Sequence, residues 1–180
     1  MQKRLLLDGR SLQVTISRLC QQLIENHGDF SNSVIIGLQP RGKALAQRMV
    51  MRLQEMTGKQ LPIGFLDTTF HRDDFRRREE PLQASKTEIP FLIEGKKVIL
   101  IDDVLFTGRS VRAALDAMTS FGRPAKVELL ILVDRLYSRH VPVEATYVGK
   151  RVNTLDTQKV LVEWSENKKV DNVWLINKEE

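Results

Sequence analysis

The sequence of 180 residues has one cysteine, few aromatic residues and no long apolar run. A single cysteine, Cys20, cannot close an internal disulfide, which excludes a disulfide-stapled scaffold and is typical of a reducing compartment. The longest apolar runs, such as Leu129–Val133, are far shorter than the roughly 20 residues that span a membrane. The first ten residues also lack the apolar stretch of a secretory signal peptide. We therefore expect a cytoplasmic protein without a membrane partner.

Composition and charge further limit the class of protein. Hydrophobic residues make up 42% of the chain and charged residues 28%, which is the balance of a globular protein with a core. This length is typical of one domain, so residues 1–180 are expected to form a single domain. The formal net charge of +5 indicates a phosphate-rich partner, either a small molecule or a nucleic acid.

Helical and strand patterns alternate along most of the chain. Apolar residues at three- and four-residue spacing predict helices over 9–26, 42–57 and 110–121. Short apolar runs predict strands over 33–37, 61–70, 97–101 and 127–133. This alternation favours an α/β fold, a mostly parallel twisted sheet with helices on both faces. Apolar pieces in the last 45 residues predict small strands outside that sheet, at 146–149, 160–164 and 173–176.

A polar segment without periodicity, residues 71–90, interrupts this alternation. It combines several arginines with acidic residues and two prolines. Irregular segments of this length inside a compact domain are usually functional or mobile, so we expect this segment to be mobile. The run Arg76–Arg78 fits either a phosphate contact or a solvated surface.

The clearest functional pattern is the segment 98–110. An apolar strand ends at two adjacent carboxylates, Asp102 and Asp103, and a short loop then opens a helix. Ligands of open α/β sheets bind beyond the carboxyl ends of the strands, and a helix N-terminus offers free N–H groups to a phosphate. Carboxylates repel phosphate but suit sugar hydroxyls or a metal ion. The pattern therefore predicts one site that holds a sugar together with its phosphate.

A second segment, Gly37–Gly42, also lies between a predicted strand and a predicted helix. It approaches the P-loop pattern, but Ala44 stands where that pattern requires a hydroxyl, and Pro40 removes one backbone N–H. A nucleoside triphosphatase is therefore disfavoured, and a loop for another phosphate is expected. Gln39–Pro40 is the one bond in this loop for which the cis form costs little.

These segments together resemble a known enzyme family. Residues 98–110 resemble the phosphoribosyl pyrophosphate (PRPP) motif of type I phosphoribosyltransferases. Further segments resemble the PyrR family, bifunctional pyrimidine-operon regulators and uracil phosphoribosyltransferases, over about residues 5–165. These segments are 41–42, 67–74, 102–113, 122–124, 132–135 and 147–150. The sequence departs from that pattern at Pro40, at Phe106 and over Leu136–His140.

The resemblance implies the type I phosphoribosyltransferase fold, with a small hood formed by about residues 134–180 and part of the N-terminus. It implies Mg²⁺-dependent transfer of phosphoribosyl from PRPP to uracil, which gives UMP and pyrophosphate. Two alternatives stay open: a type I enzyme for another base, and an RNA-binding attenuator with little enzymatic role. It further implies pyrimidine leader mRNA as a partner and a homodimer or larger assembly. Trp164 and Trp174 fit either an interface or burial within one chain.

The resemblance also assigns roles to residues of this sequence. Asp102 and Asp103 hold the ribose hydroxyls, directly or through water on Mg²⁺. Residues 71–90 resemble the flexible flap of this family, and Arg72 reaches pyrophosphate from that flap. PRPP and its 5′-phosphate are bound by Val104, Leu105, Phe106, Thr107, Gly108, Arg109 and Ser110. Pyrophosphate is also bound by Arg41 and Gly42. Base contacts are expected from Val133, Asp134 and Val152, and RNA contacts from Arg18, Arg139 and Arg151.

Overall fold

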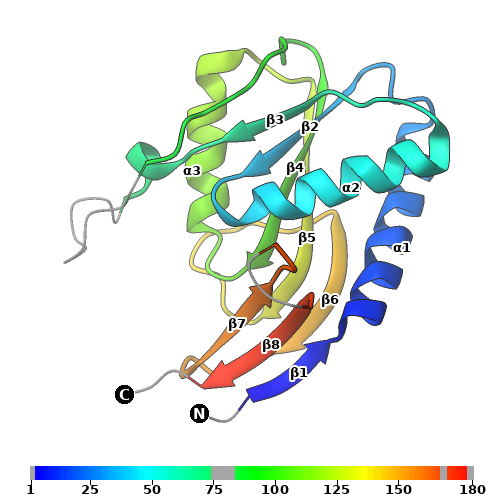
Figure 1. The fold of residues 1–180 in the computed structure, drawn as a ribbon. Helices are drawn as coiled ribbons and strands as arrows, with labels where there is room; N and C mark the ends of the chain where they lie inside the picture. Colours follow the sequence, from blue (N-terminus) through cyan, green and yellow to red (C-terminus); the bar gives the residue numbers. More distant parts are fainter. Residues whose placement is uncertain (1–2, 74–83, 167–169, 178–180) are drawn as a thin grey trace.

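The computed structural model describes residues 3–73, 84–166 and 170–177 (Figure 1). Its central layer is a five-stranded sheet in the order β3-β2-β4-β5-β6, and every neighbouring pair is parallel. The strands are β2 (Ser33–Leu38), β3 (Ile63–Leu66), β4 (Lys97–Leu105), β5 (Lys126–Leu136) and β6 (Tyr147–Asn153). The predicted α/β fold with a mostly parallel sheet is confirmed.

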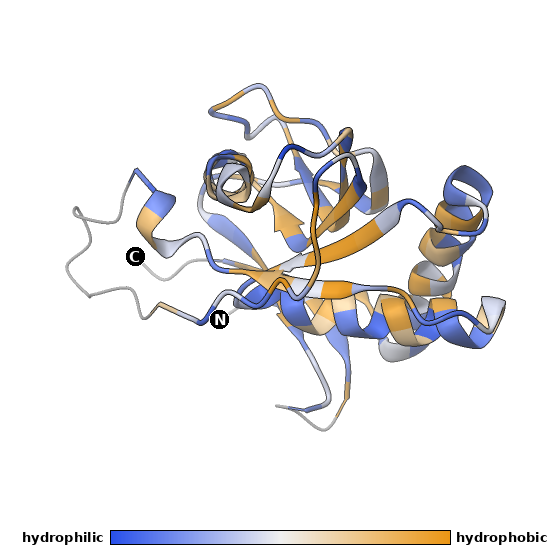
Figure 2. Cartoon of the chain, turned by 90° about the horizontal axis from the view of Figure 1, so that it is seen from above, coloured by the Kyte–Doolittle hydropathy of each residue, from blue (hydrophilic) through white to orange (hydrophobic). Residues whose placement is uncertain are grey.

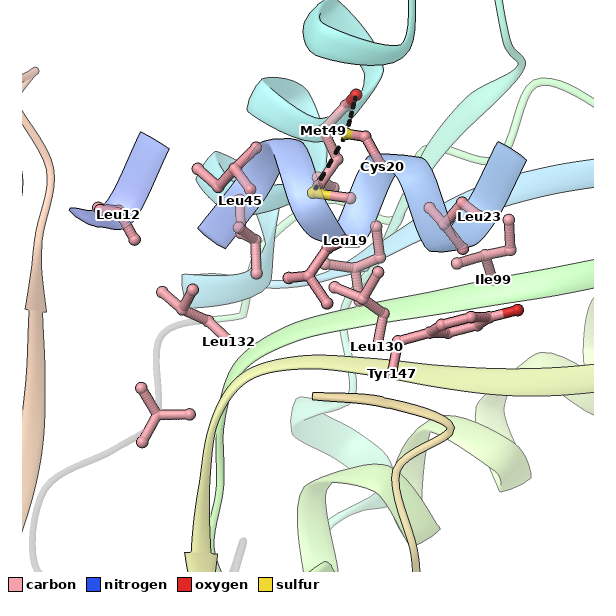
Figure 3. Close-up of a cluster of buried hydrophobic side chains, with 14 of the residues drawn as sticks. Leu12, Leu19, Cys20, Leu23, Leu45, Met49, Ile99, Leu130, Leu132 and Tyr147 are labelled. Atoms are coloured by element: carbon pink, nitrogen blue, oxygen red, sulfur yellow. Dashed lines mark hydrogen bonds between the residues drawn. The ribbon is translucent and has the colours of Figure 1, made fainter. Parts of the chain in front are cut away.

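Helices cover both faces of this sheet. The helices α1 (Gly9–His27) and α2 (Arg41–Thr57) pack on one face and α3 (Arg109–Met118) on the other. Successive strand residues point to opposite faces, so Ile99 faces α1 and α2 (Figure 3), whereas Leu100 belongs to the core under α3. Figure 2 shows the apolar residues concentrated on the central strands. Two short 3₁₀ turns follow elements of this layered fold: η1 (Thr69–His71) comes after β3, and η2 (Thr119–Phe121) comes directly after α3.

A second sheet brings the two ends of the chain together. It consists of β1 (Lys3–Leu7), β7 (Gln158–Glu163) and β8 (Asn172–Asn177), antiparallel in the order β1-β8-β7. Both tryptophans pack within the chain. The Arg48 guanidinium lies 4.3 Å from the centre of the Trp164 ring, and Trp174 Nε1 donates to Glu163 at 2.9 Å. Trp164 is therefore buried within the chain, whereas Trp174 is half-buried with its indole N–H engaged within the chain.

The structure corrects three predictions of strand extent. The segment 146–149 does not lie outside the main sheet, because it begins β6, which pairs with β5 along the edge. Both β4 and β5 run past their apolar cores, since pairing continues through Asp102↔Ile131 to Leu105↔Asp134. The two carboxylates therefore lie within a strand rather than in a loop. Of the segment 61–70, only Ile63–Leu66 is a strand.

The expected flap lies partly outside the described residues. Residues 74–83 are not described, and this includes Arg76–Arg78. The part of the expected flap that follows residue 83 pairs with β3, because Phe65 N donates to Glu88 O at 2.7 Å and Glu88 N donates to Phe65 O at 2.8 Å. Among the described helices, none is long and apolar enough to cross a membrane.

Candidate active site

A cleft of about 720 Å³ lies at the carboxyl ends of the central strands. Parallel strands end at one edge of their sheet, so residues far apart in sequence meet there. The cleft is lined by Leu38, Gln39, Pro40, Arg41, Asp67, Thr68, Thr69, Arg72, Asp102, Asp103, Val104, Phe106, Ser110, Arg135, Lys159 and Val160. The structure thus brings together both predicted carboxylates, both predicted pyrophosphate arginines and part of the predicted phosphate loop.

The two carboxylates near the end of β4 differ in their access to water, since Asp102 is half-buried and Asp103 is buried. Asp103 is 4% exposed, and its backbone N–H donates to Asp102 Oδ1 at 2.9 Å. Burial raises the pKa of Asp102 well above its usual value, and the neighbouring Asp103 adds to this shift. Burial also raises the pKa of Asp103, against the opposing effect of the Arg41 charge. Ligand hydroxyls or a cation would therefore stabilise the ionised form of the pair.

The pair suits a magnesium ion that is shared with a ligand. Across residues 3–73, 84–166 and 170–177 there is no group of three or more His, Cys, Asp and Glu side chains that could hold a metal. Mg²⁺ prefers oxygen ligands, keeps several waters and is usually held by one or two carboxylates together with substrate phosphates. Asp102 and Asp103 supply that number of carboxylates at the edge of a cleft.

The loop 106–109 joins β4 to α3 and includes the first residue of that helix; Phe106 of this loop and Ser110 of α3 line the cleft. Gly108 has a φ of +84°, and a Cβ there would lie 2.9 Å from Val141 Cγ2, so the position requires glycine. Ser110 Oγ accepts a hydrogen bond from Arg72 Nη1 at 2.7 Å. Arg109 forms an ion pair with Asp73. The loop is therefore joined to the first residues of the expected flap.

The second phosphate candidate, the loop before α2, is pressed against β4. The Gln39–Pro40 bond is cis. A Cβ on Gly42 would lie 3.0 Å from Asp102 Cα and closer still to the Ile101 carbonyl oxygen. Only glycine allows this approach, which brings Arg41 and the N-terminus of α2 next to the carboxylates.

Six residues of the cleft had no role assigned from the sequence, and three of them, Asp67, Thr68 and Thr69, directly follow β3. Arg135 at the end of β5 places its guanidinium 3.8 Å from the centre of the Phe106 ring and donates to Thr154 Oγ1 at 2.8 Å. Lys159 and Val160 reach the cleft from β7, in the other sheet. Arg135 follows the apolar run of β5 and lies in the segment 132–135 that resembles the PyrR pattern, but neither signal assigned it a role. No sequence pattern links β7 to this edge.

The three residues expected to bind the base do not line the cleft. Val133 is fully buried, and Val152 is 6% exposed in the core under α1 and α2. Asp134 is 7% exposed and ion-paired with Arg139. The reason is the length of β5, which makes Val133 and Asp134 mid-strand residues rather than the start of a loop. Leu105 is likewise a core residue, 2% exposed.

The arginines expected to bind RNA occupy different environments. Arg18 on α1 is exposed and donates to the Gly149 carbonyl of β6 at 2.5 Å. Arg151 is exposed on β6 itself. Arg139, by contrast, donates to the Phe106 carbonyl at 2.6 Å and pairs with Asp134. Its guanidinium is therefore already engaged within the chain.

Comparison with known proteins agrees with this geometry. The sequence pattern of the phosphoribosyl transferase domain matches residues 5–167. The chain is 39% identical over 175 residues to the bifunctional protein PyrR of Enterococcus faecalis, covering 97% of both chains. It is 45% identical over 174 residues to the bifunctional protein PyrR of Desulfosudis oleivorans, covering 96% of both.

Solved structures show the same fold. A hypoxanthine phosphoribosyltransferase from Staphylococcus aureus matches with a TM-score of 0.72 and 21% identity, over 98% of this chain and 92% of that one. Another from Trypanosoma cruzi matches with a TM-score of 0.73 and 14% identity, over 98% and 97%. At these identities the likeness concerns the fold. Since the domain pattern and the curated relatives each span nearly the whole sequence, the chain belongs to the phosphoribosyltransferase family and, within it, to the PyrR proteins.

Proposed function

We propose that the protein transfers the phosphoribosyl group of PRPP to uracil, which yields UMP and pyrophosphate. The observation that carries the proposal is the cleft itself. It sets two carboxylates, one half-buried and one buried, between the N-termini of two helices, each with a tightly packed glycine at its start, Gly42 in α2 and Gly108 before α3. Carboxylates for sugar hydroxyls and helix N-termini for phosphates are the groups that a phosphorylated ribose requires.

The binding roles follow from the position of each group. Asp102 and Asp103 hold the ribose hydroxyls and the Mg²⁺ ion, which neutralises the charge of pyrophosphate when it is bound. The loop 106–109 and Ser110 receive the 5′-phosphate. Arg41, the N–H groups at the start of α2, and Arg72 receive pyrophosphate.

In this reaction the protein contributes by positioning the reactants and stabilising charge, rather than by covalent catalysis. The bond from C1′ to the pyrophosphate oxygen breaks, the bond from C1′ to uracil N1 forms, and the proton of N1 is taken up by the departing pyrophosphate. Positive charge develops on the ribose ring beside Asp102 and Asp103, and negative charge leaves toward Arg41 and Arg72. Preorganised groups of opposite sign on the two sides stabilise this separation of charge.

We assign the base to the wall formed by Phe106, Arg135 and Val160. An aromatic ring, the cation stacked on it and an aliphatic side chain from β7 all face the cleft, whereas Val133, Asp134 and Val152 do not. The test is initial-rate turnover of PRPP with uracil, hypoxanthine, guanine and orotate. We expect uracil to give the highest kcat/KM. A preference for a purine or for orotate would overturn the uracil assignment and leave the family unchanged.

We also propose that the protein binds pyrimidine leader RNA, as the bifunctional name of its relatives suggests. The supporting observation is that Arg18 reaches across to the edge strand β6, which carries exposed Arg151. The test is a gel shift at several salt concentrations, with and without UMP. Exchange of Arg18 and Arg151 for alanine is expected to weaken binding and to lower its salt dependence. Absence of any UMP-stimulated binding at low salt would refute this role.

Assembly into a homodimer or larger oligomer is part of the same proposal. Val14 on α1 and Met51 on α2 are 63% and 64% exposed and line one groove. Large apolar side chains in contact are favoured at interface cores. Light scattering at micromolar concentration is expected to give at least twice the mass of one chain, 20.7 kDa. A mass of one chain would contradict this.

A further inference from the structure

The segment after β5, residues 138–141, lies behind the phosphate loop and holds its carbonyl groups. Phe106 O accepts from Arg139 Nη1 at 2.6 Å and from Ser138 Oγ at 3.1 Å. Thr107 O accepts from the backbone N–H of His140 at 2.9 Å and of Val141 at 3.3 Å. Four donors from one short segment therefore fix two successive carbonyls.

The direction of these carbonyls sets the direction of two N–H groups. In a trans peptide unit, the C=O of one residue and the N–H of the next point to opposite sides. Holding the Phe106 and Thr107 carbonyls against residues 138–141 therefore turns the N–H groups of Thr107 and Gly108 the other way. They then add to the N–H groups in the first turn of α3, and N–H groups gathered at a helix N-terminus form a site that binds a phosphate.

Among residues 138–141, which hold these two carbonyls, Arg139 makes the largest number of side-chain hydrogen bonds. Its guanidinium donates to Phe106 O, to Arg135 O at 3.0 Å and, through Nε, to Val143 O at 3.1 Å, and it forms an ion pair with Asp134. A planar fork with this many fixed acceptors has little freedom to rotate. Packing is tight on the same side, since a Cβ on Gly108 would meet the side chains of Val141 and Val143.

We propose that Arg139 is a positioning residue for phosphate binding. By holding the Phe106 carbonyl, it directs the Thr107 N–H toward the 5′-phosphate of the ligand. The inference rests on the proposed assignment of the loop 106–109 to the 5′-phosphate. It does not depend on which base is accepted.

The test compares two probes that bind at opposite ends of the cleft. Isothermal titration calorimetry of the full chain uses ribose 5-phosphate as one probe and magnesium pyrophosphate as the other. For Arg139→Met we expect the Kd of ribose 5-phosphate to rise about tenfold, the loss of one charge-assisted hydrogen bond, and the Kd of pyrophosphate to stay within about twofold. Ser138→Ala removes a neutral donor to the same carbonyl and is expected to give a smaller rise.

Arg48→Met is the matched control. The Arg48 side chain is 18% exposed against 23% for Arg139, and it likewise pairs with carboxylates, those of Glu166 and Asp171. It is expected to lower the melting temperature without changing the Kd of either probe. If Arg139→Met proves unfolded because Asp134 loses its partner, the double variant with Asp134→Asn removes the orphaned charge and is measured instead.

The outcomes separate this inference from the proposed function. A Kd for ribose 5-phosphate that is unchanged in Arg139→Met, or that rises together with that of pyrophosphate, would overturn the positioning role. If wild-type protein fails to bind ribose 5-phosphate, the phosphate loop itself is wrongly assigned and the inference falls with it. If ribose 5-phosphate binds and responds as expected but uracil is not a substrate, the proposed function fails and the role of Arg139 stands.

Discussion

Exchange of Gly42 for alanine tests the close approach of α2 to β4. The added Cβ would lie 3.0 Å from Asp102 Cα and closer to the Ile101 carbonyl oxygen, whereas ordinary contact begins at 3.4 Å. Every one of these neighbours is backbone, so no side chain can turn aside. The N-terminus of α2 must therefore move away from β4 by about 1 Å, and displacements of that size at a reacting centre cost about a hundredfold in rate.

The stability cost of this variant is expected to be moderate, about 1–3 kcal/mol, as for other overpacked sites. The assay is initial-rate PRPP turnover together with thermal unfolding. Gly9→Ala is the control, because Gly9 also lies in the first turn of a helix and its Cβ would need to shift Asp171 O, at 3.3 Å, by only a few tenths of an ångström. A Gly42→Ala protein with wild-type kcat/KM would refute the argument that this contact positions the pyrophosphate side of the cleft.

Two further predictions concern ionisable groups that are buried or half-buried. Asp102→Asn and Asp103→Asn are each expected to lower turnover about a hundredfold. Because burial raises the pKa of both carboxyls, their ionised form destabilises the native state, so each variant is expected to melt higher at neutral pH. The difference in melting temperature between variant and wild type should shrink as the pH falls toward about 4, because the wild-type carboxyls are then protonated and neutral, like the amide. A variant that melts lower than wild type at neutral pH would contradict this prediction. Glu128→Ala removes the partner of His27 Nε2, at 2.7 Å, and of the Tyr147 hydroxyl, at 2.9 Å, and is expected to cost about 2–4 kcal/mol of stability with turnover unchanged. Denaturant unfolding and the turnover assay measure both effects.

The layered fold was predictable because the spacing of apolar residues along the sequence shows which face of a helix or strand is buried. The helix expected over 9–26 is observed as Gly9–His27, and its end coincides with Gly28, which has a positive φ. The strand β6 was misplaced for a physical reason. It is an edge strand with polar Lys150 and Arg151, and only Tyr147 and Val152 are buried, so its apolar pattern is too short to indicate membership of the main sheet.

The site was predictable where its residues lie beside a strand end and less so elsewhere. Asp102 and Arg41 were found because each interrupts or follows an apolar run at the functional edge. The full lengths of β4 and β5 were hidden, because polar residues such as Asp103 and Asp134 occur inside the strands there, where local pattern and tertiary pairing disagree. Lys159 reaches the cleft through the pairing of distant segments, which no local pattern records.

The central claim is that this cleft transfers phosphoribosyl to uracil, and a competition assay tests it most directly. Purified protein receives limiting PRPP, Mg²⁺ and equal concentrations of uracil and hypoxanthine, and the nucleotide products are separated by chromatography and counted. Hypoxanthine is the sharpest competitor, because the solved structures that share the fold at low identity include hypoxanthine phosphoribosyltransferases. The account predicts UMP in large excess together with one pyrophosphate per UMP. Equal or greater formation of IMP, or consumption of PRPP without any UMP, would contradict it.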